Sequence, residues 1–99
     1  MKEYLSILNK AFENRLRLAI MSMLMLDEWV DFNTFKEMLG VTDGNLASHI
    51  SALEKADYIK VKKQFVGKKT NTSYSATKSG SKAFLEHLEA LEKLIKKIE

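Results

Sequence analysis

The chain has 99 residues, of which 45% are hydrophobic and 29% are charged, and its formal net charge is +3. This length supports one small domain, and the composition is typical of a globular protein. The absence of cysteine excludes disulfide bonds, cysteine-ligated zinc and a thiol switch. No apolar run approaches the roughly 20 residues of a membrane-spanning helix, and the N-terminus does not resemble a signal peptide. We therefore expect a cytoplasmic protein without a membrane partner.

The first third of the chain indicates two helices. Residues 3–12 carry apolar side chains at helical spacing and predict a short amphipathic helix. Asn14 can cap a second helix over residues 15–26, and this helix is apolar on most faces. A helix of that kind usually lies at the centre of a core. Residues 27–31 predict a connection or a short extended piece, with Trp29 packed at the edge of the domain.

A helix-turn-helix is predicted next. Asn33 or Asp31 can cap a third helix, and Gly40 ends it in the usual position for a left-handed glycine. Thr42 can cap a fourth helix over residues 43–55. Only about three residues separate the two helices, which puts the fourth helix in the position of a recognition helix. Its outer face is small and polar, whereas a merely solvated helix usually carries long Glu and Lys side chains.

The start of this recognition helix supplies candidate contacts to DNA, because its first turns meet base edges and phosphates. The candidates are Thr42, Gly44, Asn45, Ser48, His49 and Ser51. Asn45 suits the edge of adenine, although a second capping role is an equal alternative. The two serines could instead be plainly solvent-exposed, and His49 could be a satisfied residue at the border of the core. Gly44 would serve close approach or simply an unstrained first turn.

The segment 59–82 contains seven lysines and no acidic residue. Asp57 precedes it as a left-handed residue, and residues 59–62 then alternate like a strand. Residues 67–72 predict a turn or loop, and residues 73–76 a weak returning strand. A basic hairpin directly after a helix-turn-helix is a wing, and lysines on phosphates supply most of the non-specific affinity for DNA. The expected contacts to phosphate or minor groove, with solubilising loop charge as the alternative, are Lys68, Lys69, Thr70 and Asn71.

The C-terminal segment predicts a long helix that Thr77 caps. Its apolar residues recur at spacings of 4, 3, 4 and 3, which is an a/d seam over about two heptads. The seam consists of Phe84, Leu88, Leu91, Ile95 and Ile98. A 20-residue helix is about 30 Å long, and a domain of this size cannot easily cover it. We therefore predict that the seam, with Leu5 and Leu8, packs against a second copy; packing on its own domain is the alternative. His87 is expected at the surface.

Three motifs resemble those of small MarR/ArsR-type winged helix-turn-helix regulators. Residues 39–50 (LGVTDGNLASHI) resemble the turn and recognition helix, and residues 53–59 (LEKADYI) resemble the helix end and the start of the wing. In the second motif Asp57 stands where the family usually has Gly. Residues 74–80 (YSATKSG) are similar to the end of the wing. The resemblance covers roughly residues 14–90 and implies a dimeric, sequence-specific DNA-binding transcription factor, often a repressor. The metal ligands of the ArsR type are absent.

These observations predict a mainly α fold with a small β-hairpin wing, as one winged-helix domain over residues 1–99. Residues 14–76 form its core, and residues 1–12 and 77–99 form flanking helices at a dimer interface. The expected function is a transcriptional regulator, expected to repress, that binds double-stranded DNA as a homodimer without cofactor or metal. The recognition helix would enter the major groove, and the wing would contact flanking backbone or minor groove. A winged-helix module that binds proteins is the alternative.

An enzyme is disfavoured, because the sequence has no Ser-His-Asp set, no metal-ligand cluster and no Gly-rich phosphate-binding motif. The sequence leaves open whether a small-molecule effector acts on the protein.

Overall fold

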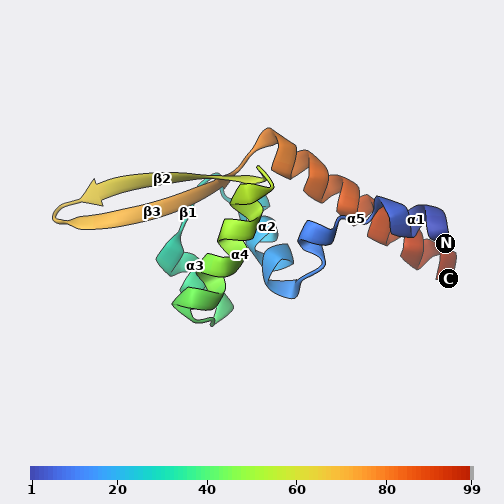
Figure 1. The fold of residues 1–99 in the computed structure, drawn as a ribbon, viewed down its shortest axis with the longest axis horizontal. Coiled ribbons are helices and arrows are strands. Elements are labelled where there is room, and N and C mark those ends of the chain that lie inside the picture. Colours follow the sequence, from blue (N-terminus) through green and yellow to red (C-terminus); the bar gives the residue numbers. More distant parts are fainter. Residues whose placement is uncertain (99) are drawn as a thin grey trace.

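The computed structural model describes residues 1–98, and their side chains through residue 97. The elements, in chain order, are α1 (Lys2–Ile7), the 3-10 turn η1 (Lys10–Phe12), α2 (Arg15–Leu26), β1 (Val30–Asp31), α3 (Phe32–Leu39), α4 (Asp43–Lys55), β2 (Ile59–Val66), β3 (Lys69–Ala76) and α5 (Lys78–Ile98). The molecule is elongated, with principal extents of 54 × 26 × 22 Å. The β2–β3 hairpin projects from one end and α1 lies along α5 at the other, with α2, α3 and α4 between them (Figure 1). The predicted mainly α fold with a hairpin wing is confirmed.

Local capping chemistry sets most helix boundaries. Asn14, Asp31 and Thr42 each accept hydrogen bonds from backbone N–H groups in the first turn of α2, α3 and α4. Of the two caps considered for α3, the aspartate is the one that is used. Gly40 ends α3 at a φ of 62°, and Asp57 follows α4 at a φ of 63°. Both left-handed positions are those that the sequence predicts.

The N-terminal helix is shorter than the one predicted over residues 3–12. Leu8 is extended, with φ −60° and ψ 136°, and η1 follows it. The Asn9 side chain accepts a hydrogen bond from the backbone N–H of Ala11 at 2.9 Å and so begins a new turn. A short polar side chain that bonds to its own backbone in this way competes with helix continuation. The break directs Phe12 into the core, where it is fully buried.

The core lies between the helices and the base of the sheet. Its members are Phe12, Ile20, Met21, Leu24, Val30, Phe35, Leu46, Ile50, Leu53, Ile59, Tyr74 and Phe84. The prediction that Phe84 faces a second copy is wrong, because this side chain is 2% exposed and packs within its own chain. Its ring meets that of Phe12 edge-on, with 5.4 Å between the centroids. The first residue of the predicted seam therefore packs on its own domain, and the exposed part of the seam begins one turn later, at Leu88.

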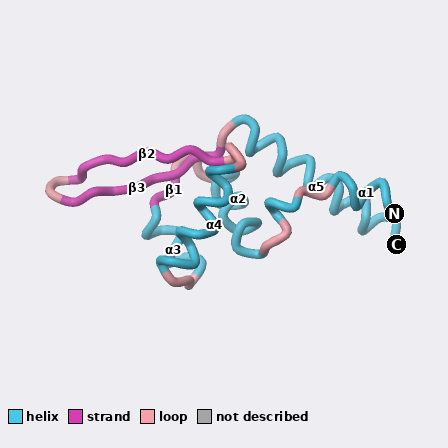
Figure 2. The backbone as a smooth tube through the Cα atoms, viewed as in Figure 1, coloured by secondary structure: helices cyan, strands magenta, loops and turns pink. Residues whose placement is uncertain are grey.

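The sheet is antiparallel, with strand order β1-β3-β2. β2 and β3 pair along their whole length, from Ile59↔Ala76 to Val66↔Lys69, so only Gly67 and Lys68 form the loop. Figure 2 shows the two long strands and their short connection. Gly67 has a φ of 67°, and a positive φ at the first of two loop residues is the pattern of a type II′ hairpin. The loop predicted over residues 67–72 is thus too long, and the polar returning strand is longer than predicted.

No helix in the described part of the chain combines the length and the apolarity that crossing a bilayer would require.

Candidate nucleic-acid interface

The exposed face of α4 gathers most of the predicted recognition residues. Thr42, Gly44, Asn45 and Ser48 are exposed at its N-terminal end, whereas His49 and Ser51 are half-buried further along. The opposite side of the helix supplies three buried side chains to the core, namely Leu46, Ile50 and Leu53. The Thr42 hydroxyl oxygen accepts the backbone N–H of Asn45 at 3.2 Å, so its first role is to cap the helix. The Asn45 side-chain amide makes no hydrogen bond to any described residue.

Neither the backbone conformation at Gly44 nor its surroundings require glycine at this position. Its φ is not in the left-handed region, and a Cβ added there would meet no atom within 4 Å. Glycine inside a helix is about 1 kcal/mol less favourable than alanine. A glycine in open space on the exposed first turn is therefore suited to close approach of another molecule.

An ion pair crosses the turn between α3 and α4. The Lys36 ammonium lies 2.7 Å from a carboxylate oxygen of Asp43, and both side chains are largely exposed. An exposed pair of this kind adds little to stability. Its effect at this place is to offset the negative charge of Asp43 beside the N-terminal end of α4.

His49 has a partner that the sequence did not identify. The Nε–H of Arg17, on α2, donates to His49 Nδ1 at 3.1 Å. With Nδ1 accepting, the neutral imidazole carries its proton on Nε2 and can donate from there. Arg17 therefore orients a candidate recognition residue. No local spacing in the sequence links these two residues, which are 32 positions apart.

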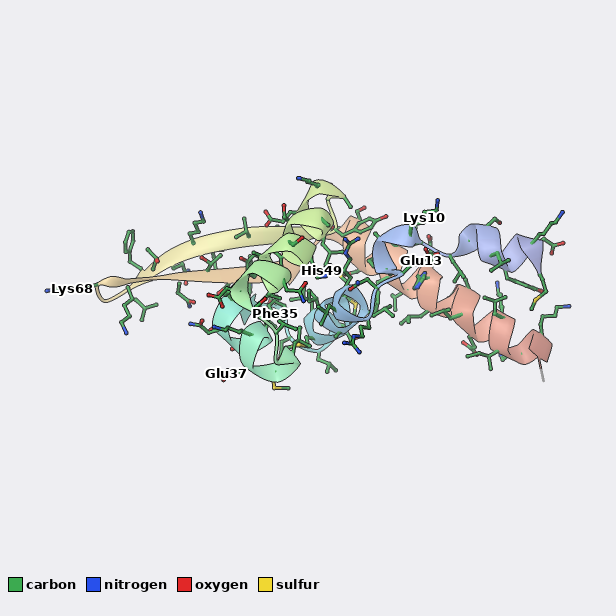
Figure 3. The ribbon with its side chains drawn as sticks, turned by 60° about the horizontal axis from the view of Figure 1, so that its bottom comes forward. Lys10, Glu13, Phe35, Glu37, His49 and Lys68 are labelled. Carbon is green, nitrogen blue, oxygen red and sulfur yellow. The ribbon has the colours of Figure 1, made fainter. Side chains whose placement is uncertain are left out.

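The four predicted wing residues lie together at the outer end of the hairpin. Lys68 is in the loop at its far tip (Figure 3), and Lys69, Thr70 and Asn71 follow on β3. All are exposed except Asn71, which is half-buried. Successive strand residues face opposite sides, so Thr70 faces away from its two neighbours. No acidic residue stands anywhere in the hairpin, and its tip is therefore electropositive.

Two other lysines of the wing are held at its base by Trp29. The ammonium of Lys62 lies 4.0 Å from the centroid of the Trp29 ring, and that of Lys60 lies 5.6 Å away. Lys60 and Lys62 share one face of β2, because they are two residues apart on the strand. A cation over an indole face contributes about 0.5–1 kcal/mol at exposed sites. Trp29, just before β1, thus braces the wing against the body of the domain.

The α1–α5 arm retains an apolar surface. Of the predicted dimer residues, Leu5, Leu88 and Ile95 are 58%, 40% and 57% exposed, while Leu8 and Leu91 are half-buried. The side chain of Ile98 lies outside the described residues. Two further apolar side chains on the arm, not among the predicted residues, are about half exposed: Ile7 and Leu85.

The expectation that His87 lies at the surface is wrong. This side chain is 3% exposed, and its Nδ1 accepts the backbone N–H of Asn9 at 2.9 Å. The Asn9 side chain donates in turn to the Tyr58 hydroxyl at 2.8 Å, and the ring of Phe12 packs on both His87 and Tyr58. Burial lowers the pKa of His87, and the carboxylate of Glu13 partly opposes this shift. His87 lies three residues after Phe84 and therefore on the same face of α5. This spacing was a signal in the sequence that His87 is buried.

Acidification is expected to destabilise the fold through His87. Its pKa in the folded protein lies below the ordinary value of about 6.5, so the unfolded chain takes up the proton first as pH falls. The free energy of unfolding should therefore decrease as pH falls below about 6.5 and should level off below the folded pKa. Denaturant unfolding at pH 7.5 and 5.5 measures this loss. His87→Gln keeps an acceptor for Asn9 and should lose less stability over the same interval; an identical loss in both proteins would contradict the assignment.

An open cleft lies along α3. Its volume is about 530 Å³, and it is lined by Asn33, Lys36, Glu37, Gly40 and Val41. Within residues 1–98, no three His, Asp or Glu side chains are grouped closely enough to hold a metal ion.

Comparison with known proteins agrees with this geometry. Residues 16–95 match a family model described as winged helix DNA-binding domain. The uncharacterized protein MJ0432 of Methanocaldococcus jannaschii is 33% identical over 90 residues, which are 91% of this chain and 98% of that protein. The structure of a transcriptional regulator homologue protein from Pyrococcus horikoshii OT3 is 28% identical, with a TM-score of 0.89 over 100% of this chain and 99% of that one.

A more distant structure, NadR in complex with 4-hydroxyphenylacetate, shares the fold. It is 22% identical, with a TM-score of 0.72 over 100% of this chain and 70% of that one. The resemblance to winged helix-turn-helix regulators, which was carried by the recognition helix and the start of the wing, is thereby confirmed. The chain belongs to the winged helix DNA-binding domain family.

Proposed function

We propose that the protein is a homodimeric, sequence-specific transcriptional regulator, and that it acts as a repressor in the cytoplasm. In this proposal α4 enters the major groove of double-stranded DNA, and the β2–β3 wing contacts the flanking backbone and minor groove. The observation that carries it is the combination of an acid-free hairpin with a small, polar and exposed N-terminal end of α4. Lysine contacts to phosphate fix the position of such a domain, and side chains on the recognition helix read the bases.

The proposal of a dimer is supported by the apolar surface of the α1–α5 arm. Leu5, Leu88 and Ile95 are exposed there in a single copy, and Leu88 and Ile95 are seven residues apart and so share one face of α5. Two copies joined through their arms would present two recognition helices to half-sites one helical turn apart, about 34–36 Å, or a multiple of it.

A double substitution on the arm tests the interface. Leu88→Glu with Ile95→Glu puts two charges on the exposed seam and should convert the dimer to a monomer, measured by sedimentation at fixed protomer concentration. Glu89→Gln with Lys93→Gln changes two exposed residues of the same helix and should leave the dimer intact. A parent protein that sediments as a monomer would contradict the proposed assembly.

The test of DNA binding is sedimentation of the purified protein with a random-sequence duplex at low and moderate salt. We expect the protein to bind at low salt and to release the duplex as salt rises, because bound phosphates release their counterions. Failure to bind even at low salt would overturn the proposal and would favour a protein-binding module instead. Selection of a duplex from a random library then identifies the preferred sequence.

Gly44→Ala separates the requirements of the fold from those of binding. The added Cβ meets open space, so the variant should be more stable by about 0.5–1 kcal/mol through helix propensity. The same methyl group would lie on the face that approaches the major groove, and we expect several-fold weaker DNA binding. Denaturant unfolding and fluorescence anisotropy measure the two effects. A variant that is more stable and binds DNA as the parent does would show that Gly44 is not at the interface.

A further inference from the structure

The tip of the wing carries apolar side chains that the fold does not use. Phe65 is 80% exposed and Val66 is 63% exposed, although both stand on β2. At the base of the same strand, by contrast, Ile59 is buried in the core and is 3% exposed. Burying a phenylalanine ring is substantially favourable, and no described residue of the chain covers this one.

The surroundings of Phe65 indicate what kind of molecule could cover it. Its strand partner is Thr70, and the loop residue Lys68 lies just beyond, whereas Lys69 pairs with Val66 and faces the other side of the hairpin. Lys63 lies two residues before Phe65 and so shares its face of the strand. The nearest acidic residues in the sequence, Asp57 and Glu86, stand outside the hairpin on either side. The tip thus offers an aromatic ring within a cluster of positive charges.

This combination is complementary to the minor groove of DNA. Two rows of phosphates border the groove, and its floor presents sugar and base edges on which apolar side chains can lie. Proteins that bend DNA insert apolar wedges of this kind between base steps and hold the neighbouring phosphates with basic residues. Lysine supplies charge without the planar fork of arginine, so the lysines at the tip are suited to the phosphates and the ring to the groove.

We propose that Phe65 enters the minor groove beside each half-site as an apolar wedge, with Lys68 and, from the other face of the tip, Lys69 on the bordering phosphates. The inference rests on the proposed function and adds a determinant of specificity to it. A wedge opens the base step that it enters, and pyrimidine–purine steps such as TA open most easily. The wing therefore selects flexible steps in the flanking sequence and bends the DNA there, without hydrogen bonds to the bases.

The experiment uses the full chain and a 40-base-pair duplex recovered with it by selection from a random library. Affinity, the dependence of affinity on salt, and end-to-end fluorescence energy transfer are measured for the parent and three variants. Phe65→Ala should weaken binding about tenfold, should leave the salt dependence unchanged and should abolish the bend. Phe65→Leu keeps an apolar wedge and should stay within about threefold. Val66→Ala, on the opposite face of the strand, should also have a small effect.

The outcomes separate the wedge from the proposed function. If the parent binds no duplex at low salt, both fail. If the parent binds and Phe65→Ala binds and bends the duplex equally well, the wedge alone is refuted. Equal losses in Phe65→Ala and Val66→Ala would also refute it, since they would show a general effect of the tip. Binding to phosphatidylserine vesicles that is lost in Phe65→Ala, with DNA binding unchanged, would assign the tip to a membrane surface instead.

Discussion

Replacing Lys68 and Lys69 together with alanine is expected to weaken DNA binding about 100-fold for each wing that contacts DNA, at roughly 0.1 M salt. Both residues lie at the tip of the wing, are exposed and have no acidic neighbour in the hairpin. Each lysine that neutralises a phosphate adds about one unit to the slope of log affinity against log salt. The slope should therefore decrease by about 2 for each wing. Fluorescence anisotropy with one duplex over a series of salt concentrations measures both quantities.

A charge-matched control is available on the α1–α5 arm. Lys2→Ala with Lys93→Ala removes the same net charge from two exposed residues of the other end of the molecule. This control should change affinity much less than the wing variant does, because the effect of the wing is local contact rather than total charge. If the wing variant keeps the salt slope of the parent, the wing does not contact phosphate and its assignment is wrong.

Gly80→Ala is expected to produce the largest loss of stability of any single methyl addition considered. Gly80 lies in the first turn of α5, directly against the backbone at Tyr58. A Cβ there would overlap the Tyr58 carbonyl oxygen and would lie 2.7 Å from the carbonyl carbon. Two hydrogen bonds hold this junction: Thr77 N–H donates to the Tyr58 carbonyl at 3.0 Å, and the Thr77 hydroxyl donates to the Asp57 carbonyl at 2.7 Å. Backbone must therefore move, and we expect a loss of about 3 kcal/mol.

Gly44→Ala is the matched control for this variant, because it makes the same substitution in a helix with open space around it. The two variants should change the free energy of unfolding in opposite directions, measured by denaturant unfolding at equal protomer concentration. For a domain of this size the Gly80 variant should lose roughly 12–24 °C in melting temperature. Equal effects of the two substitutions would show that α5 can shift away from the Tyr58 backbone at little cost.

Features that depend on residues close in sequence were the most predictable. The caps at Asn14 and Thr42, and the left-handed positions of Gly40 and Asp57, follow from the chemistry of one or two side chains. The order of helices and wing follows from periodicity and from charge. The exposure of Thr42, Gly44, Asn45 and Ser48 also follows locally, because the buried stripe of α4 determines its outer face.

Features that depend on distant partners were missed. The break after α1 is stabilised by bonds from Asn9 to Tyr58 and His87, which are 49 and 78 positions away. The burial of Phe84 likewise depends on Phe12, which the break brings into the core. The polar residues of β3 have weak strand propensity by themselves, and pairing with the whole of β2 extends the strand beyond what they indicate.

The junction at Asp57 and Tyr58 fixes the angle between the two ends of the molecule. The wing and α5 leave this junction toward opposite ends of the long axis (Figure 1). A change in the angle between α5 and the rest of the domain at this junction would therefore change the distance from the arm to the wing tip. In the proposed dimer the distance between the two tips would be set at this junction, so substitutions there should change the preferred spacing of half-sites without touching DNA.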